Sequence, residues 1–248
     1  MQVTVYAQHD FVDPQQLAGS TAVVIDTFRA TSTVTAALEN GCAAVIPVAH
    51  KEDAFRLRRE VPAYREALLG GERKTQIIPG FDCGNSPLEY TRARIGGRVL
   101  ILSTTNGTKA VAKAERASAI YLGCLNNSEA VAKRLWRRGE DVQIVCAGTK
   151  GNFSLEDVVS AGAMIHYLKL WGGGEVVCND LGYTAWKMFE GYGADMDGLL
   201  RPTRHYGTML KNDLAEDIAY CIQLNISRSV PVCQNGQVIL ASEEEETR

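Results

Sequence analysis

Mostly apolar runs that end abruptly in small polar residues occur three times along this 248-residue chain. Each run and the polar stretch after it are Thr21–Ile25 with Asp26–Ser32, Arg98–Leu102 with Ser103–Thr108, and Val142–Cys146 with Ala147–Ser154. Apolar residues then recur at helical spacing, over Thr33–Asn40, from about Lys109, and over Leu155 to about Leu170. The pattern predicts a strand, a polar loop and a helix, repeated three times.

Further strands and helices are predicted between these units. Apolar composition predicts strands at Ala43–Val48 and Ala119–Leu122, and helical spacing predicts helices at Lys51–Arg59 and Ser128–Arg138. Such alternation is typical of right-handed βαβ units. We therefore expect an α/β fold, a three-layer α/β/α arrangement with a largely parallel or mixed sheet. Ligands of such sheets bind outside the carboxyl ends of the strands, so the three polar loops are expected to converge on one site.

The C-terminal part follows a different pattern. We expect a helix with its approach over Thr203–Ile222 and a hairpin over Val230–Ala241 with an Asn-Gly turn. The acidic end, residues 243–248, is predicted to be a flexible, solvated tail. No Pro/Gly/Ser-rich linker marks a boundary, so residues 1–248 are interpreted as one domain. Two closely packed halves, divided near residue 125 or 140, remain an alternative.

Composition excludes several classes of protein. Hydrophobic residues make up 46% of the chain and charged residues 22%, and the net charge is -3, which argues against nucleic-acid binding. No apolar run reaches the roughly 18 residues of a membrane span, and the N-terminus lacks signal-peptide features. The seven cysteines are scattered without CxxC spacing, which favours reduced thiols and a cytoplasmic location. The sequence leaves open whether the chain forms a homodimer.

The polar loops have two interpretations. Ser, Thr and Asn at a helix start are common N-caps, and the unpaired N–H groups there also bind anions such as phosphate. One such loop alone favours the cap, whereas three at equivalent positions favour an anionic ligand. The candidate binding residues in these loops are Thr31, Ser32, Thr104, Thr105, Asn106, Gly107, Thr108 and Thr149. At Gly107 we expect either a close approach of the ligand or a positive φ.

Two charged residues of the first loop are candidate catalytic groups. Arg29 can hold two phosphoryl oxygens with its planar guanidinium. Asp26 directly follows a buried strand, where an acid can ligate a metal, act as a nucleophile or cap the following helix. These three roles stay open at the level of the residues.

The stretch from Gly70 to Pro87 is the richest irregular segment, and its Gly and Pro residues predict a defined loop. It carries Glu72 and Asp82, followed by Asn85 and Ser86 ahead of a Pro at the first position of a helix. Carboxylate and amide oxygens without a His cluster suit Mg²⁺. A solvated acidic loop is the alternative interpretation.

Several phosphatase and hydrolase signatures are absent. The chain has no P-loop GxxxxGK[ST], no cysteine followed six residues later by Arg, and no GxSxG. Phe28 interrupts an Asp-x-Asp pair, and the sequence RHYG at 204–207 only imitates the RHG of histidine phosphatases. Thiolate and histidine-nucleophile phosphatases are therefore not favoured.

Several motifs, in order, match one family. They are DTFRATST (residues 26–33), GER (71–73), GFDCGNSP (80–87), TTNGT (104–108), and AGT (147–149) with FSLED (153–157). Together they resemble the 2-phosphosulfolactate phosphatase (ComB-like) family from about Val23 to Pro231. Cys83 departs from the pattern at a position where an aliphatic residue is expected, which reads as a packing difference.

The resemblance implies a ComB-like α/β phosphatase that depends on Mg²⁺. The implied reaction converts (2R)-2-phospho-3-sulfolactate to 3-sulfolactate and phosphate, as in coenzyme M biosynthesis. On this basis Asp26, Arg29, Glu72 and Asp82 are the predicted catalytic residues, and Asp26, Glu72 and Asp82 are the predicted Mg²⁺ ligands. The alternative is that one of these carboxylates acts as a general base or as a transient nucleophile. Asn85 and Ser86 join the polar loops as predicted contacts of a small, anionic, phosphorylated substrate. The alternatives are a phosphatase for another small phosphorylated acid and a non-catalytic binding protein.

Overall fold

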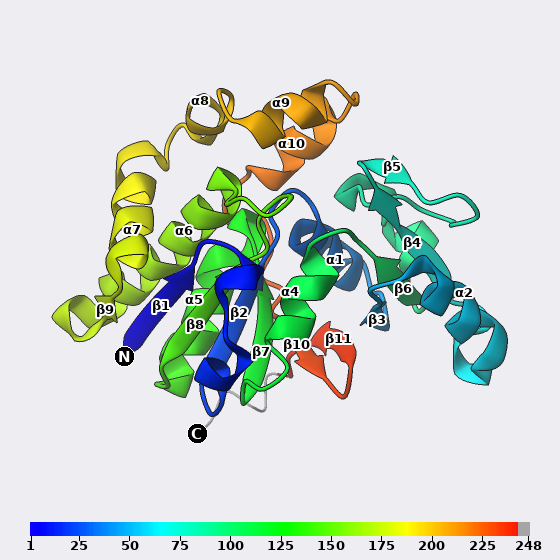
Figure 1. Cartoon of the computed structure of the whole chain (residues 1–248), viewed down its shortest axis with the longest axis horizontal. Helices are drawn as coiled ribbons and strands as arrows, with labels where there is room; N and C mark the ends of the chain where they lie inside the picture. Colours follow the sequence, from blue (N-terminus) through cyan, green and yellow to red (C-terminus); the bar gives the residue numbers. More distant parts are fainter. Residues whose placement is uncertain (243–248) are drawn as a thin grey trace.

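A computed structural model describes residues 1–242 and shows one mixed, mostly parallel sheet of 11 strands with helices packed on it (Figure 1). The strands are β1 (Gln2–Tyr6), β2 (Thr21–Ile25), β3 (Ala44–Pro47), β4 (Leu68–Arg73), β5 (Gln76–Ile77), β6 (Val99–Ser103), β7 (Ala119–Gly123), β8 (Val142–Cys146), β9 (Val177–Cys178), β10 (Pro231–Gln234) and β11 (Gln237–Leu240). Their order is β5-β4-β6-β3-β11-β10-β7-β2-β8-β1-β9. The predicted α/β class is confirmed, and residues 243–248, predicted as a flexible tail, lie outside the described part.

The helices are α1 (Ala30–Glu39), α2 (Lys51–Glu60), α3 (Arg92–Ile95), α4 (Gly107–Lys113), α5 (Ser128–Arg138), α6 (Leu155–Gly172), α7 (Asp180–Tyr192), α8 (Met196–Leu200), α9 (Arg204–Leu210) and α10 (Ala215–Cys221). The predicted strand–loop–helix units are therefore present, with strand and helix ends shifted by a few residues at most. The sequence patterns did not reveal β1, β9, α7 or α8.

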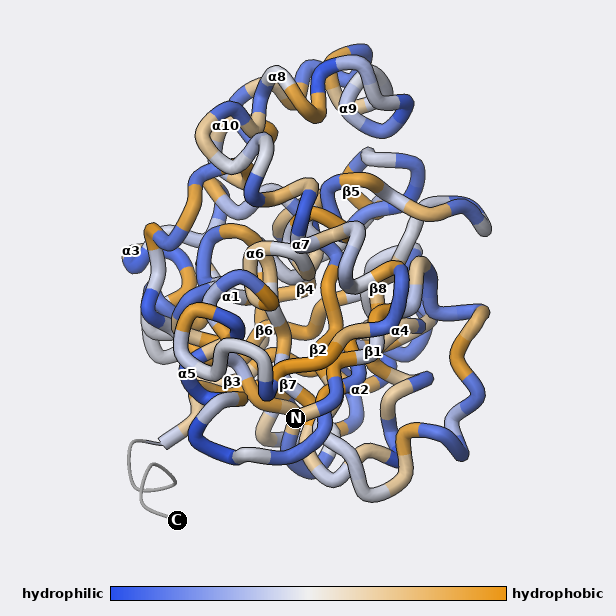
Figure 2. The backbone as a smooth tube through the Cα atoms, turned by 90° about the vertical axis from the view of Figure 1, so that its left-hand side faces the viewer, coloured by the Kyte–Doolittle hydropathy of each residue, from blue (hydrophilic) through white to orange (hydrophobic). Residues whose placement is uncertain are grey.

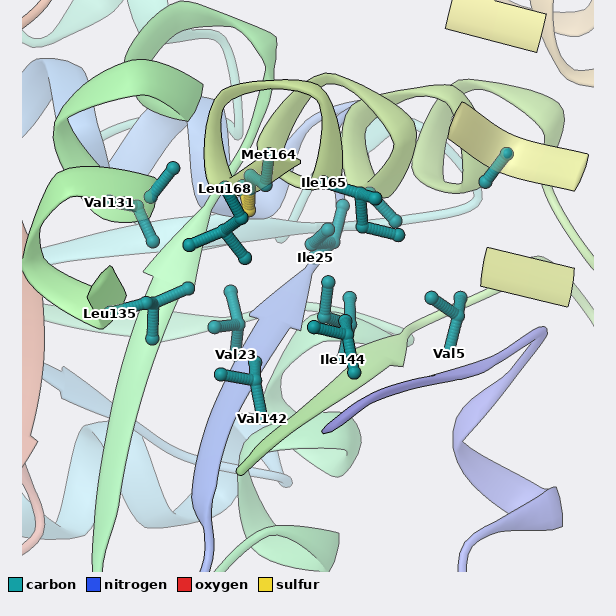
Figure 3. Packing of buried hydrophobic residues seen from close by; sticks show 14 of the residues in the cluster. Val5, Val23, Ile25, Val131, Leu135, Val142, Ile144, Met164, Ile165 and Leu168 are labelled. Carbon is teal, nitrogen blue, oxygen red and sulfur yellow. The ribbon is translucent and has the colours of Figure 1, made fainter. Parts of the chain in front are cut away.

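The side chains of β2 alternate between the two faces of the sheet, and those on both faces are buried. Val23 and Ile25 point toward α5 and α6, where they pack with residues such as Met164 and Leu168 (Figure 3). Ala22 and Val24 point the other way and pack against α4. The strands therefore run through the hydrophobic centre of the molecule (Figure 2). This burial on both faces explains why β2 reads as a continuous apolar run.

The predicted hairpin is confirmed, but it does not lie at an edge. β10 and β11 pair antiparallel around a turn in which Asn235 and Gly236 have φ of 52° and 76°, as a type I′ turn requires. β11 pairs with β3 and β10 with β7, so the hairpin joins the two parallel parts of the sheet.

Two predictions of local structure are wrong. The start of the expected loop at Gly70 is strand β4, which pairs parallel with β6. Its glycines permit this because a Cβ at Gly71, where φ is 145°, would lie 2.0 Å from the Ser103 carbonyl oxygen. The expected helix over Thr203–Ile222 is split into α9 and α10, since Asp213 between them adopts a φ of 59°.

The carboxyl ends of the strands carry a cover of short helices. Figure 1 shows α8, α9 and α10 above the sheet, at the end where β5 also lies, and the view in Figure 2 agrees. Of these helices, α9 lines a cavity together with the polar loops. Among residues 1–242, no helix has the length and apolar character needed to cross a bilayer.

Candidate active site

A cavity of about 620 Å³ lies at the carboxyl ends of the strands. Its walls come from the loops after β2, β6 and β8, from the β4–β5 turn and from α9. The three polar loops therefore converge on one cavity, as the sequence predicted. A volume of this size suits a small ligand.

Asp26 directly follows β2 and is 8% exposed. The backbone N–H of Ala30 donates a weak, 3.4 Å hydrogen bond to Oδ1, whereas Oδ2 accepts none from the described residues. Burial raises the pKa of Asp26 to about 6, the charge of His205 lowers it, and the charges of Glu72 and Glu156 raise it further. Since the capping contact is weak, Asp26 is a carboxylate with one oxygen left for a ligand.

Glu72 joins two walls of the cavity. Its Oε1 accepts hydrogen bonds from the backbone N–H and the hydroxyl of Thr105, at 2.9 and 2.7 Å. Its Oε2 accepts a 3.0 Å hydrogen bond from the N–H of Thr75. Glu72 therefore holds the β4–β5 turn against the TTNGT loop, and Oε2 keeps acceptor capacity.

The loop after β6 contributes Thr104, Thr105 and Asn106 to the cavity wall. Gly107 and Thr108 instead line a small apolar cavity between α1 and α4. The Thr108 hydroxyl donates to the Thr104 carbonyl oxygen at 3.0 Å, which is a helix-start contact. These two residues therefore support the loop rather than line the larger cavity.

Gly107 is required by a close approach, not by a positive φ, since it is not among the residues with φ above zero. A Cβ at this position would lie 2.6 Å from the Ala30 Cβ and 2.9 Å from Asp26 Oδ2. Ala30 of α1 and Asp26, rather than a bound ligand, therefore exclude a side chain at position 107.

Arg29 lines the cavity and is also a structural residue. Its Nη1 donates to Asp217 Oδ2 at 2.5 Å, and its Nη2 donates to the Thr75 carbonyl oxygen at 3.2 Å. Ser86, a predicted substrate contact, donates to Asp217 Oδ1 at 2.5 Å and caps the short 3₁₀ helix Pro87–Glu89. The sequence did not mark Asp217, which lies on α10.

The other predicted contacts divide into two groups. Thr31 and Ser32 are fully buried and shape the first loop, because Thr31 Oγ1 accepts from the N–H of Asp26 and Ser32 Oγ donates to the Thr27 carbonyl oxygen. Asn85 lines the cavity, is 4% exposed, and has a buried Oδ1 without a hydrogen-bond partner among the described residues. An unpartnered buried acceptor is costly, which makes Oδ1 of Asn85 a candidate ligand contact.

Asp82 lies outside the cavity. Its Oδ2 accepts hydrogen bonds from Arg58 Nη1 at 2.7 Å and from the N–H of Leu69 at 2.8 Å. The structure thus brings Asp26 and Glu72 together at the cavity but not Asp82. Within residues 1–242, no group of three His, Cys, Asp or Glu side chains is arranged to hold a metal ion.

The first turn of α6, directly after the third loop, contributes two acids to which the sequence patterns gave no role. Asp157 accepts hydrogen bonds from the N–H groups of Thr27 and Gly148, at 2.9 and 3.0 Å, and so ties the first loop to the third. Glu156, its buried neighbour, lies 2.5 Å from Nδ1 of His205. Both acids belong to the FSLED motif, and this motif is the sequence feature from which a role for them could have been predicted.

Three exposed cations surround the cavity: Lys74, Lys150 and Arg204. None of them forms an ion pair within the described residues. Thr149, a predicted contact, lies beside them and shares a 2.8 Å hydrogen bond with Ser154. The rim is therefore positive and suits an anion with more than one charged group.

The cavity contains no cysteine among its lining residues. Cys83, the departure from the motif pattern, is fully buried, and burial raises its pKa to about 11. Its thiol is neutral at physiological pH, which fits the packing role expected from the sequence.

Comparisons with known proteins point to one family. A family model described as 2-phosphosulpholactate phosphatase matches residues 6–236. A protein of Symbiobacterium thermophilum named probable 2-phosphosulfolactate phosphatase is 44% identical over 228 residues, 91% of this chain and 96% of the relative. A protein of the same name from Clostridium acetobutylicum is 37% identical over 239 residues, 96% of this chain and 100% of the relative. One from Caldanaerobacter subterraneus is 38% identical over 234 residues, 94% and 95% of the two chains.

Proposed function

Since the chain belongs to the 2-phosphosulpholactate phosphatase family and is a phosphoric monoester hydrolase, we propose that its substrate is (2R)-2-phospho-3-sulfolactate. The observation that carries this proposal is the cavity itself, which is lined by Asp26 together with the cations Arg29, Lys74, Lys150 and Arg204. The proposed products are 3-sulfolactate and inorganic phosphate.

The charges of the cavity match those of this substrate. The molecule carries a phosphate, a sulfonate and a carboxylate on three carbon atoms. Arg29 lies deep in the cavity beside Asp26, whereas Lys74, Lys150 and Arg204 lie at its exposed rim. We assign the phosphate to the buried end, next to Asp26, and the sulfonate and carboxylate to the cations of the rim.

We further propose that Mg²⁺ takes part. Asp26 and Glu72 supply carboxylate oxygens, and the unpartnered Oδ1 of Asn85 supplies an amide oxygen, a donor set that Mg²⁺ prefers. Two carboxylates suffice because Mg²⁺ commonly completes its coordination with water and substrate phosphate. When bound, the ion would neutralise charge on the phosphoryl oxygens.

The chain's own residues then orient the reactants. Arg29, held in place by Asp217 and Thr75, presents its remaining N–H groups toward the phosphate. The Oδ2 atom of Asp26 can accept a hydrogen bond from the attacking water and so orient it toward phosphorus. The cover formed by α9 reduces access of bulk water to the buried end, which strengthens these interactions.

The setting of the reaction is part of the proposal. The seven cysteines are all free, which supports a reducing, cytoplasmic environment. The sulfonated product supports a role in coenzyme M biosynthesis, the pathway that the family resemblance implies.

The test is release of inorganic phosphate from a panel of esters, each with and without Mg²⁺. The panel contains 2-phospho-3-sulfolactate, 2-phospholactate, which lacks the sulfonate, and 3-phosphoglycerate. We expect kcat/KM to be highest for the sulfonated ester and to fall when Lys150 or Arg204 is replaced by Ala. Equal kcat/KM for 2-phospholactate would show that another phosphorylated acid is the substrate. Tight binding of all esters without phosphate release would contradict hydrolysis.

A further inference from the structure

His205 and Glu156 form a pair in the cavity that the proposed function has not yet used. His205 lies in the first turn of α9 and lines the cavity together with Asp26. Its Nδ1 lies 2.5 Å from Oε1 of Glu156, which belongs to the first turn of α6. The two residues are 49 positions apart in the chain, so only the fold brings them together.

Glu156 is unusual among the acids of the site because its carboxylate has few hydrogen-bond partners besides His205. Its side chain is 1% exposed, and Oε2 has no hydrogen-bond partner among the described residues. A buried carboxylate in this position needs a nearby positive charge. His205 is the only side chain in the described structure that forms an ion pair with it. The contact with Glu156 therefore favours the form of His205 in which both ring nitrogens carry a proton.

The orientation of the ring follows from the same contacts. Nδ1 faces Glu156 and also lies 3.3 Å from the Thr149 hydroxyl. The ring packs edge-on against Phe28, with ring centroids 5.9 Å apart. Nε2 makes no hydrogen bond within the described residues, so it is the nitrogen available to a ligand.

The charges around His205 support the doubly protonated form. Burial lowers the pKa of His205, but the hydrogen bond to Glu156 and the negative charges of Glu156 and Asp26 outweigh burial and raise it above the ordinary value. The guanidinium of Arg29 acts in the opposite direction. These groups come from α6 and from the loop after β2.

We propose that His205 is the catalytic acid that protonates the ester oxygen as it leaves phosphorus, and that Glu156 is its positioning residue. This inference rests on the proposed phosphatase function. An alkyl phosphate needs such a group because its leaving oxygen would otherwise depart as a strongly basic alkoxide.

The proposed step moves one proton from Nε2 of His205 to the leaving oxygen. The bond between phosphorus and the ester oxygen breaks, the electron pair stays on that oxygen, and the oxygen takes the proton from Nε2. The attacking water adds to the phosphoryl group with both of its protons, which gives dihydrogen phosphate and the free alcohol. The neutral His205 then regains a proton from dihydrogen phosphate or from solvent.

The experiment compares two esters that differ in the acidity of the leaving alcohol. 2-Phospholactate and its 3,3,3-trifluoro analogue share the phosphate and carboxylate, but fluorine makes the leaving oxygen much less dependent on protonation. For His205→Gln we expect kcat to fall at least about 100-fold with 2-phospholactate, the scale for a lost general acid, and only a few fold with the trifluoro ester. His166→Gln is the matched control, because His166 lies outside the cavity and pairs with Glu190.

The pH profile gives a second readout with Glu156→Gln. Wild-type kcat should fall at alkaline pH as His205 loses its proton. In the Glu156→Gln variant this alkaline limb should move to lower pH, because the charge that holds the proton is gone. An unchanged alkaline limb in that variant overturns the proposal, even if His205→Gln fails to fold.

The results distinguish a failure of the acid assignment from a failure of the proposed phosphatase function. Equal loss of kcat for both esters in a folded His205→Gln protein would show a structural role and overturn the assignment of the acid. Full activity of that variant on both esters would do the same and leave the phosphatase function intact. If wild-type protein releases phosphate from no ester of the panel, the proposed function fails and the acid assignment with it.

Discussion

The guanidinium of Arg29 lies 2.5 Å from the carboxylate of Asp217, and each side chain is only 5% exposed. The two residues are 188 positions apart, so this buried pair anchors the loop after β2 to α10. Because Ser86 donates to the second oxygen of Asp217, the pair also fixes the segment before Pro87. The proposed phosphate-binding arginine is thus part of the scaffold of the site.

Arg29→Lys is expected to lower both binding and turnover. The variant keeps the charge near Asp217 but loses the contact of Nη2 with the Thr75 carbonyl oxygen and the planar fork. We expect kcat/KM for phosphate release to fall at least about 10-fold, the scale of one lost charge-assisted hydrogen bond. Asp217→Asn should instead lower the free energy of unfolding by roughly 3 kcal/mol, since it leaves the buried guanidinium unpaired. Urea denaturation and steady-state kinetics check both values, and wild-type kinetics for the Lys variant would make Arg29 purely structural.

Asp26→Asn is expected to be inactive but more stable. The pKa of Asp26 rises from 3.8 to about 6 on folding, mainly through burial. Below about pH 3 the group is protonated in both states, whereas from about pH 4 upward it ionises in the unfolded chain first, and the full destabilisation is present above pH 6. The substitution should therefore raise the free energy of unfolding at pH 7.5, in metal-free buffer, by roughly 2–3 kcal/mol and leave it unchanged at about pH 3. The same variant should lose at least about 100-fold in kcat. A gain in stability, relative to wild type, that is smaller at pH 7.5 than at low pH would contradict the predicted sign of the pH dependence.

Gly107→Val is expected to damage both stability and activity. Its Cβ would meet the Ala30 Cβ and Asp26 Oδ2 at distances below 3.0 Å, so α1 and Asp26 must shift. We expect a loss of about 1–3 kcal/mol in the free energy of unfolding together with a reduced kcat. Thr108→Ala is the comparison variant. It removes only the hydrogen bond to the Thr104 carbonyl oxygen, for a loss of about 1 kcal/mol, and should keep kcat and KM. Thermal unfolding and steady-state kinetics of the two variants test these expectations. A normal kcat for Gly107→Val would refute the proposed crowding of Asp26.

Removal of Mg²⁺ is expected to abolish phosphate release. After treatment with EDTA, activity should return on addition of Mg²⁺, and Asn85→Ala should raise the Mg²⁺ concentration needed for half activity about 10-fold or more. Asp82→Asn is the control, because Asp82 pairs with Arg58 outside the cavity and should leave the Mg²⁺ dependence unchanged. Activity that survives EDTA would remove the metal from the proposal. A loss of Mg²⁺ dependence in Asp82→Asn would place the metal elsewhere.

Local patterns determined much of the fold. The apolar composition of β2 reflects burial on both faces, and the Asn-Gly sequence of the C-terminal hairpin predicts its turn because both residues readily adopt a positive φ. The split of the expected helix over Thr203–Ile222 and the strand character of Gly70 and Gly71 did not follow. In both cases a tertiary contact or a left-handed residue overrides the local preference.

The candidate site shows the same division. The sequence by itself identified Asp26 as an acid after a buried strand, and Glu72 and Asn85 as polar groups of an irregular segment, because residue type and local pattern are local properties. Only the tertiary structure decided which partner each carboxylate contacts. Asp82 pairs with Arg58, Asp217 pairs with Arg29, and Glu156 pairs with His205. Each of these pairs joins residues at least 24 positions apart, and only the packing of the sheet with its covering helices brings them within hydrogen-bond distance.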